Sequence, residues 1–170
     1  KQMHLMHDLV GLRKSVLFLN YDRERGFGNY RVMNVWWQGR GGNEDLMLLI
    51  AHLIEDHGRW RGATVRLMRV VDNSAAIEQT RQHMQTTLAS ARVDAEPVII
   101  VRDSPDTPIN EIIKKNSVDA DLSILGMQVF DDYDEREAYA DRLHTLATAV
   151  GTVLLVRNAE LDTDLLNSDD

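Results

Sequence analysis

Short apolar runs alternate with runs of helical spacing along most of this chain, and this alternation limits its possible folds more than any other feature. The apolar runs have the length and composition of buried strands. Strands are expected near residues 32–37, 64–70, 97–101, 121–125 and 152–157, and helices near 44–57, 74–91, 108–116 and 135–149. Strands that alternate with helices form a parallel sheet through right-handed crossovers, with helices on both faces. The sequence therefore predicts an α/β fold with a doubly wound, mostly parallel, five-stranded sheet.

The stretch at residues 31–54 shows the repeating unit most clearly. A β-branched and aromatic run, suited to a buried strand, gives way through a glycine turn at residues 39–42 to a Leu/Ile-rich helix. Asn43 suits the cap position of this helix, and the two acidic residues after it place negative charge at its positive end. These residues specify a strand, a turn and a helix, and they carry no catalytic signal.

The sequence pattern divides the chain into three parts. Residues 1–30 are interpreted as the closing helix, strand and linker of a preceding, related unit, residues 31–158 as an α/β domain, and residues 159–170 as an acidic C-terminal tail. The polar, glycine-containing segment at residues 21–29 is typical of a surface connection. Because the chain starts with Lys1 and enters helical apolar spacing at once, we expect it to be a piece of a longer protein.

An internal sequence similarity supports this division. At an offset of 137 residues, a short helix and strand near the N-terminus match the last helix and strand of the chain. The matched positions are His7, Leu9, Ser15, Val16, Leu17, Phe18 and Leu19 with His144, Leu146, Thr152, Val153, Leu154, Leu155 and Val156. A chance likeness between two ordinary αβ endings is the alternative interpretation.

Composition argues against several classes of function. A net charge of −8 at pH 7 opposes binding to nucleic-acid phosphates and anionic lipid headgroups, and no local basic patch is visible in the sequence. The chain has no cysteine, which excludes disulfides and thiolate chemistry and fits a reducing cytosol. Its longest apolar run, residues 46–51, is far shorter than the ~20 residues that cross a bilayer, so no direct membrane insertion of this fragment is expected.

The glycines at positions 39, 41 and 42 stand where doubly wound folds bind phosphate on helix amides. These glycines complete neither of the two common phosphate-binding motifs, the dinucleotide-binding motif and the P-loop. Glu44 stands where the dinucleotide motif has its last glycine, and no Gly-Lys-Ser/Thr follows for a P-loop. A plain βα turn is the preferred interpretation, and no cofactor is expected.

No set of residues in the sequence defines a catalytic or metal site. His4 and His7 are three residues apart, and His52 can share a helical face with Glu55 or Asp56, but spacing places no further metal ligands beside either pair. The chain has no Gly-x-Ser-x-Gly elbow and no cysteine nucleophile. We therefore expect a non-catalytic domain without a metal.

The helix at residues 44–57 has more apolar surface than one sheet covers, because eight of the nine residues from 46 to 54 are apolar. The side chains expected to face the sheet are Leu46, Leu49, Ile50 and Leu53. The candidate interface residues are Met47, Leu48 and Ile54, joined by the possible anchors Trp36 and Trp37. A helix that is apolar all round is buried all round, so we expect a second copy, the preceding unit or another domain to cover it.

Several segments carry a resemblance to a known family through their order and spacing. They are Val35-Trp36-Trp37, the glycine pair at 41 and 42, the Leu/Ile-rich helix, Trp60, the strand at 64–70 and the closing strand at 153–158. Together they resemble the cytosolic C-terminal domain of the cation-chloride cotransporters, the Na-K-Cl cotransporter family. The resemblance spans most of the chain, and none of its pieces is catalytic.

The resemblance implies a regulatory and dimerisation domain on the cytoplasmic side of the cell membrane, within an integral membrane protein that cotransports sodium, potassium and chloride. It implies two partners, a second copy in a homodimer and the transmembrane domain of the same transporter. The segment at 103–107 is short where animal relatives carry long charged insertions, and Gly151-Thr152 stands where they tend to have prolines. The chain therefore resembles a compact prokaryotic member, and the regulatory sites of animal relatives are not carried over.

The five expected strands also resemble the universal stress protein fold, a Rossmann-like arrangement whose ATP-binding members have a glycine-rich loop before the last helix. Here that loop is residues 126–135, where only Gly126 suits the pattern. The carboxylates that would face a triphosphate there are Asp131, Asp132, Asp134 and Glu135. Because like charges repel, ATP is not expected to bind. A universal-stress-like nucleotide-binding domain is the alternative function, and a fragment of another α/β enzyme is a third.

Overall fold

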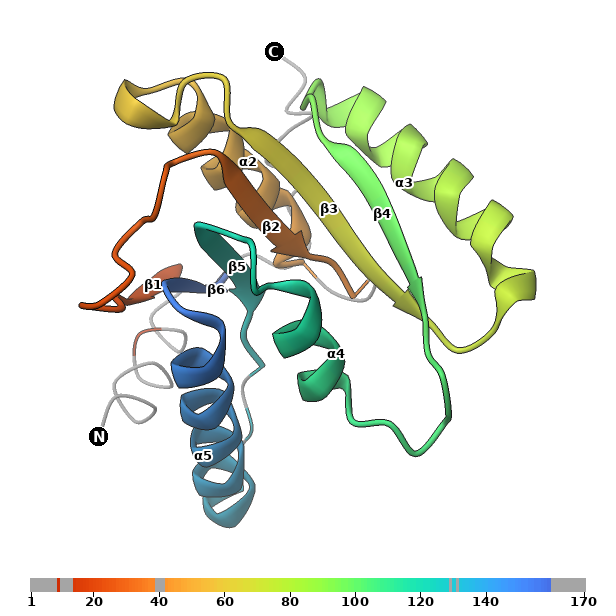
Figure 1. The fold of residues 1–170 in the computed structure, drawn as a ribbon. Coiled ribbons are helices and arrows are strands. Elements are labelled where there is room, and N and C mark those ends of the chain that lie inside the picture. Colours follow the sequence, from red (N-terminus) through yellow and green to blue (C-terminus); the bar gives the residue numbers. More distant parts are fainter. Residues whose placement is uncertain (1–8, 10–13, 39–41, 129, 131, 160–170) are drawn as a thin grey trace.

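The computed structural model describes residue 9 and residues 14–38, 42–128, 130 and 132–159. These residues form a six-stranded sheet flanked by helices (Figure 1). The strands are β1 (Val16–Asn20), β2 (Val32–Trp36), β3 (Thr64–Val71), β4 (Glu96–Val101), β5 (Leu122–Gly126) and β6 (Val153–Arg157). The helices are α2 (Glu44–Glu55), α3 (Ile77–Ala91), α4 (Ile109–Asn116) and α5 (Tyr133–Val150), with 3₁₀ turns η1 (Gly58–Trp60) and η2 (Ser74–Ala76).

The strand order across the sheet is β1-β6-β5-β2-β3-β4. The strands from β2 to β6 pair in parallel with their neighbours, which confirms the predicted doubly wound core. β1 adds a sixth strand, which runs antiparallel to β6. The strand that the sequence assigned to a preceding unit is thus hydrogen-bonded to the closing strand of the α/β domain.

The two faces of the sheet carry separate hydrophobic cores, which lie under different helices (Figure 1). On one face, Met33 and Val35 of β2 pack with buried residues of α2 and α3. On the other face, Trp36 of β2 and Met68 of β3 pack with α4 and α5. Because alternate residues of a strand point to opposite faces, a run that is apolar at every position is what this two-sided burial requires.

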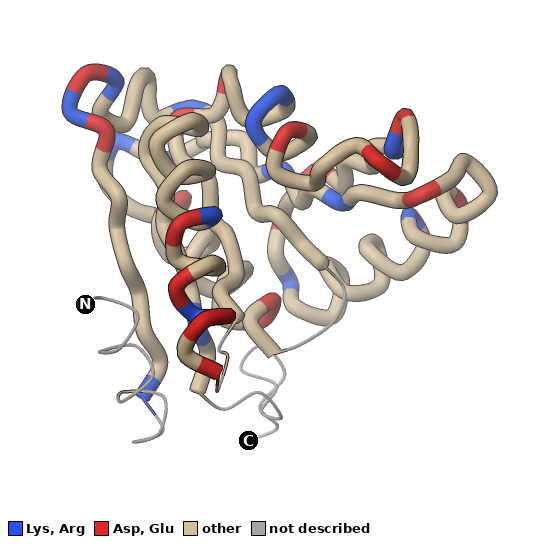
Figure 2. The backbone as a smooth tube through the Cα atoms, turned by 90° about the horizontal axis from the view of Figure 1, so that it is seen from below, with Lys and Arg blue, Asp and Glu red and all other residues tan. Residues whose placement is uncertain are grey.

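Charged residues of both signs are spread along the chain (Figure 2), and the central strands β2 and β5 contain none. Asp134 and Glu135 lie in the first turn of α5, where negative charge interacts favourably with the helix dipole. Within the described part of the chain, none of the helices is both long enough and apolar enough to cross a membrane.

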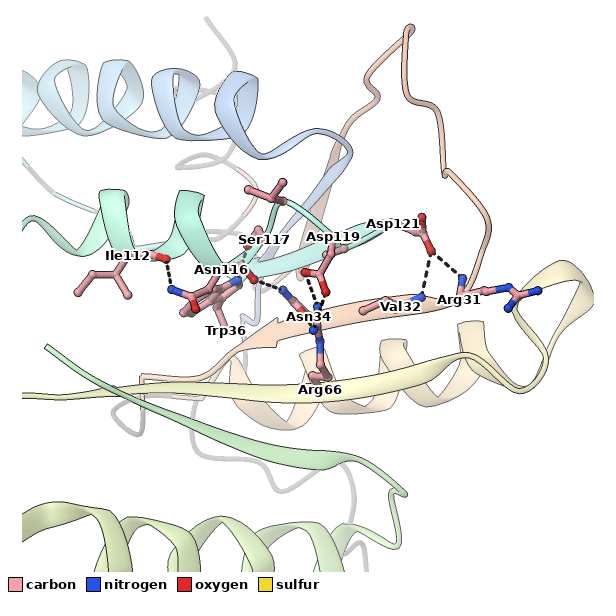
Figure 3. Close-up of polar contacts among 12 residues, drawn as sticks. Arg31, Val32, Asn34, Trp36, Arg66, Ile112, Asn116, Ser117, Asp119 and Asp121 are labelled. Atoms are coloured by element: carbon pink, nitrogen blue, oxygen red, sulfur yellow. Dashed lines mark hydrogen bonds and ion pairs between the residues drawn. The ribbon is translucent and has the colours of Figure 1, made fainter. Parts of the chain in front are cut away.

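The connection between β1 and β2 is tied to the sheet by one carboxylate. Asp121 Oδ1 accepts the backbone N–H of Asn29 at 3.0 Å, and Asp121 Oδ2 accepts those of Arg31 and Val32 at 2.7 and 3.1 Å. Figure 3 shows the last two of these contacts. Gly28 has a φ of +48°, and a Cβ atom there would collide with the same carboxylate, so this position requires glycine. The predicted surface connection is therefore closely held rather than loose.

Candidate functional site

Four of the five candidate interface residues lie inside the domain. Trp36 and Trp37 are 5% and 7% exposed, and Met47 and Leu48 are 1% and 0% exposed. Their side chains pack against the sheet and its helices, so they do not form a surface that a partner contacts directly. Ile54 is half-buried at the edge of the core, and only its side chain remains available at the surface.

The predicted orientation of α2 is therefore only partly correct, because Leu46 and Ile50 pack against the core as expected. Met47, Leu48 and Ala51 face the sheet, whereas Leu53, which was expected to face it, is 51% exposed. The physical reason is that this helix has apolar residues on every side. Without a polar face to mark the solvent side, the sequence does not indicate which face packs on the sheet.

The two tryptophans of β2 have different structural roles. Trp36 donates its indole N–H to Ser117 Oγ at 3.1 Å beneath α4. Trp37 lies on the opposite face and stacks on the ring of His83, with 5.2 Å between the ring centres. Adjacent strand residues point to opposite faces, so the pair anchors helices on both sides of the sheet.

An apolar groove of about 460 Å³ lies between α2 and the strands β1 and β6. Its lining includes Leu19, Phe27, Ile50, Leu53, Ile54 and Leu154. Leu17 and Leu19 of β1, the edge strand of the sheet, are 51% and 53% exposed. Large side chains exposed together in this way indicate a surface that another element covers.

An aromatic cluster adjoins this groove. Phe27, which also lines the groove, lies 5.8 Å from both Tyr30 and Trp60 between ring centres, and Tyr30 lies 5.1 Å from Trp60. The guanidinium carbon of Arg59 sits 4.0 Å from the centre of the Tyr30 ring. Such edge-on ring packing stabilises a fixed arrangement, so this wall of the groove is preformed.

A polar network lies under the loop between α4 and β5 (Figure 3). Asn34, which is fully buried in β2, donates to the carbonyl of Asn116 at 3.0 Å and accepts from Arg66 Nε at 2.8 Å. Arg66 also binds both carboxylate oxygens of Asp119, at 2.9 and 3.0 Å, and these hydrogen bonds hold the pKa of the Asp119 carboxyl below its usual value. A carboxylate held in this way suits a structural role, and the network fixes the loop to the sheet.

The carboxyl ends of β2 and β5, where the strand order reverses, carry the position where nucleotide-binding folds of this type hold phosphate. Here Asn43 donates to the carbonyl of Met127 at 2.8 Å and accepts the N–H of Asn158 at 2.8 Å. A Cβ atom on Gly126 would lie 3.1 Å from Asn43 Nδ2, so protein atoms closely approach this glycine. Asp132 caps α5 by accepting the N–H of Glu135, while Asp131 and residues 39–41 lie outside the described residues.

We expect isothermal titration calorimetry of the chain with Mg-ATP to give no saturable heat. The physical reason is that Asn43 already occupies the space next to Gly126, and carboxylates at the start of α5 repel a triphosphate. One-to-one binding in the low micromolar range would contradict this prediction and favour the nucleotide-binding alternative.

The metal candidates of the sequence receive no support as sites. No group of three potential metal ligands occurs among the residues that the structure describes, which include His52, Glu55 and Asp56. His4 and His7 lie outside those residues.

Comparison with known proteins gives three matches. The sequence model of the family "Solute carrier family 12" matches residues 28–117, just over half of the chain. Potassium/chloride cotransporter 3 of Caenorhabditis elegans is 30% identical over 69 residues, which are 40% of this chain and 6% of that protein. The crystal structure of the cytoplasmic domain of a prokaryotic cation chloride cotransporter superposes with a TM-score of 0.74 at 18% identity, over 97% of this chain and 60% of that one.

The fold is thus that of a cotransporter cytoplasmic domain, an α/β domain of the universal stress protein type. The chain belongs to solute carrier family 12, and the resemblance to the cation-chloride cotransporters is confirmed. The chain spans only a small part of the length of the curated relative that it matches.

Sequence reasoning missed Leu17 and Leu19 as surface residues. A signal for them was present, because residues 16–19 are apolar at four consecutive positions. Such a run is typical of a strand that is covered on both faces. Among the residues that the structure describes, only the face with Val16 and Phe18 is covered, and Leu19 on the other face lines the groove.

Proposed function

We propose that this chain is a cytosolic, non-catalytic domain of a membrane cation-chloride cotransporter. It regulates the transporter, associates with a second copy of itself and contacts the transmembrane part. Membership of solute carrier family 12 and the likeness in fold to a cotransporter cytoplasmic domain support this proposal.

One observation supports a role in binding rather than in catalysis. The polar side chains that the structure brings together, around Asn34 and Asn43, bind backbone groups and each other. The large apolar side chains that stay exposed include Leu17, Leu19 and Leu53, which lie along β1 and α2. Exposed apolar surface next to satisfied polar groups is typical of an interaction domain.

The ions carried are part of the proposal. The name of the Caenorhabditis elegans relative specifies potassium and chloride, which favours these two ions for the full protein. Transport of sodium is a prediction that rests on the resemblance to the Na-K-Cl type alone.

We also propose that residues 1–30 close a preceding unit of the same kind. The register of β1 and β6 supports this division, because Phe18 pairs with Leu155, its own counterpart at the offset of 137 residues. Val16 pairs with Arg157 and Asn20 with Val153, the arrangement that a two-fold axis through the central pair produces. Residues 159–170 form the acidic tail of this organisation.

Removing residues 1–170 from the full-length transporter tests the proposal. We expect the shortened protein to stay in the membrane, to run at the mass of one protomer in nanodiscs instead of two, and to show altered chloride-dependent cation uptake. A particle that still holds two protomers, together with unchanged uptake, would contradict both the regulatory and the dimerisation roles. The full-length protein with Met47→Glu is a milder control, because this change disrupts the folded domain without shortening the chain.

A further inference from the structure

The segment at residues 116–121, which leads from α4 into β5, bonds to several other parts of the domain. Its earlier residues bond to β2 and β3 through the network around Asn34 and Arg66 (Figure 3). Its last residue, Asp121, accepts three backbone N–H groups at the end of the connection between β1 and β2, residues 21–31. The segment therefore joins the parallel sheet to this connection.

Arg25, in the middle of the connection, binds the same segment. Its Nη2 atom donates to the carbonyls of Val118 and Ala120, at 2.8 and 3.3 Å. The side chain also packs against Gly151, where a Cβ atom would lie 3.1 Å from Arg25 Nη1. Hydrogen bonds from a charged group are stronger than those between neutral groups, so Arg25 is a second anchor of the connection.

The turn before β6 supplies a third anchor. Thr152 Oγ1 accepts the backbone N–H of Asp22 at 3.2 Å and donates to the carbonyl of Gly26. Asn20, the last residue of β1, donates its side-chain N–H to the carbonyl of Ala147 at 3.4 Å. The connection is thus held at its start, its middle and its end by the turns that precede β5 and β6.

The strand β1 packs separately from the two main cores. Val16 forms a third, smaller cluster with Met127, against which Phe18 packs. Within the described sheet, β1 pairs with β6 alone. Phe27 and Tyr30 of the connection pack at the margin of the core under α2. Separation of β1 from β6 therefore leaves most contacts of the two main cores in place.

We propose that residues 116–121 and Arg25 form a latch, and that β1 and the connection open together when this latch is released. The parallel sheet and its helices stay folded in the open state, because their cores do not depend on β1. Release of the latch frees the stretch through which residues before β1 are attached to the domain. This inference depends neither on the proposed dimer nor on the proposed division of the chain.

Native-state hydrogen exchange of the chain of residues 1–170 tests the latch. Amides that open in one unit share one free energy of opening, and therefore one protection factor. The amides of β1 that bond to β6 should match those of Asn29 and Arg31, which bond to Asp121. Their common protection factor should be at least about tenfold below that of the amides of β3 in the middle of the sheet.

Arg25→Ala removes an anchor that belongs to the connection rather than to β1. We expect the amides of β1, Asn29 and Arg31 to lose protection by the same factor, at least about tenfold, because two charge-assisted hydrogen bonds are lost. Arg23→Ala is the matched control. Arg23 is exposed in the same connection, and its side chain has no hydrogen bond or ion pair within the described part of the chain. This change should leave the exchange of all these amides unaltered.

Ile99→Val, on the opposite edge strand β4, separates opening of the latch from unfolding of the whole domain. It should lower the protection of the β3 amides about two- to tenfold and leave β1 and the connection unchanged. If Arg25→Ala affected the connection and left β1 unchanged, the two would open independently and the inference would be overturned. Protection of β1 equal to that of β3, lowered alike by Ile99→Val, would also overturn it, because β1 would then open only when the domain unfolds.

Discussion

Replacing Met47 by Glu should destabilise the isolated chain by about 4 kcal/mol or more, because the new carboxylate would be buried without a partner. Met47 is 1% exposed and packs between α2 and the sheet. Since small domains are stable by only about 5–15 kcal/mol, much of the protein should be unfolded at 37 °C. Urea unfolding followed by circular dichroism measures the loss.

Leu53→Glu is the matched control for this change on the same helix. Leu53 is 51% exposed, so the carboxylate stays in water and the cost should be below about 1 kcal/mol. If Leu53→Glu destabilised the chain as much as Met47→Glu, the orientation of α2 described here would be incorrect.

Asp121→Ala should cost about 2–4 kcal/mol, because it removes the acceptor of three backbone N–H groups at once. Those N–H groups belong to Asn29, Arg31 and Val32, which fix the connection between β1 and β2. We expect faster hydrogen exchange at these amides together with the lower stability in urea.

Asp119→Ala provides the comparison for Asp121→Ala two positions earlier in the chain. The Asp119 side chain is 66% exposed where it pairs with Arg66, and exposed ion pairs contribute about 1 kcal/mol or less. Equal effects of the two changes, or unchanged exchange at the amides of Arg31 and Val32 in Asp121→Ala, would contradict the proposed anchoring of the connection.

The parallel core of the fold was predictable because its strands are covered on both faces. Met33 and Val35 fill the core on one face of the sheet, and Trp36 and Met68 fill the core on the other. The strands are therefore apolar at nearly every position, and this pattern predicts strands that are buried on both faces. The pairing of β1 with β6 was not predictable, because antiparallel addition to a sheet edge leaves no local sequence signal.

The candidate site was predicted less well than the fold. The sequence indicated surplus apolar surface on α2, and the structure places such surface beside the groove. It assigned this surface to Met47 and Leu48 rather than Leu53, because the choice depends on how α2 is rotated on the sheet. That rotation is decided by tertiary packing against β2 and β5, which helical spacing in an all-apolar segment does not encode.

A structure of the full-length transporter by electron cryomicroscopy tests the central claim most directly. We predict that this domain lies on the cytoplasmic side, in contact with a second copy and with the transmembrane part. A domain that contacts neither a second copy nor the transmembrane part would contradict the account.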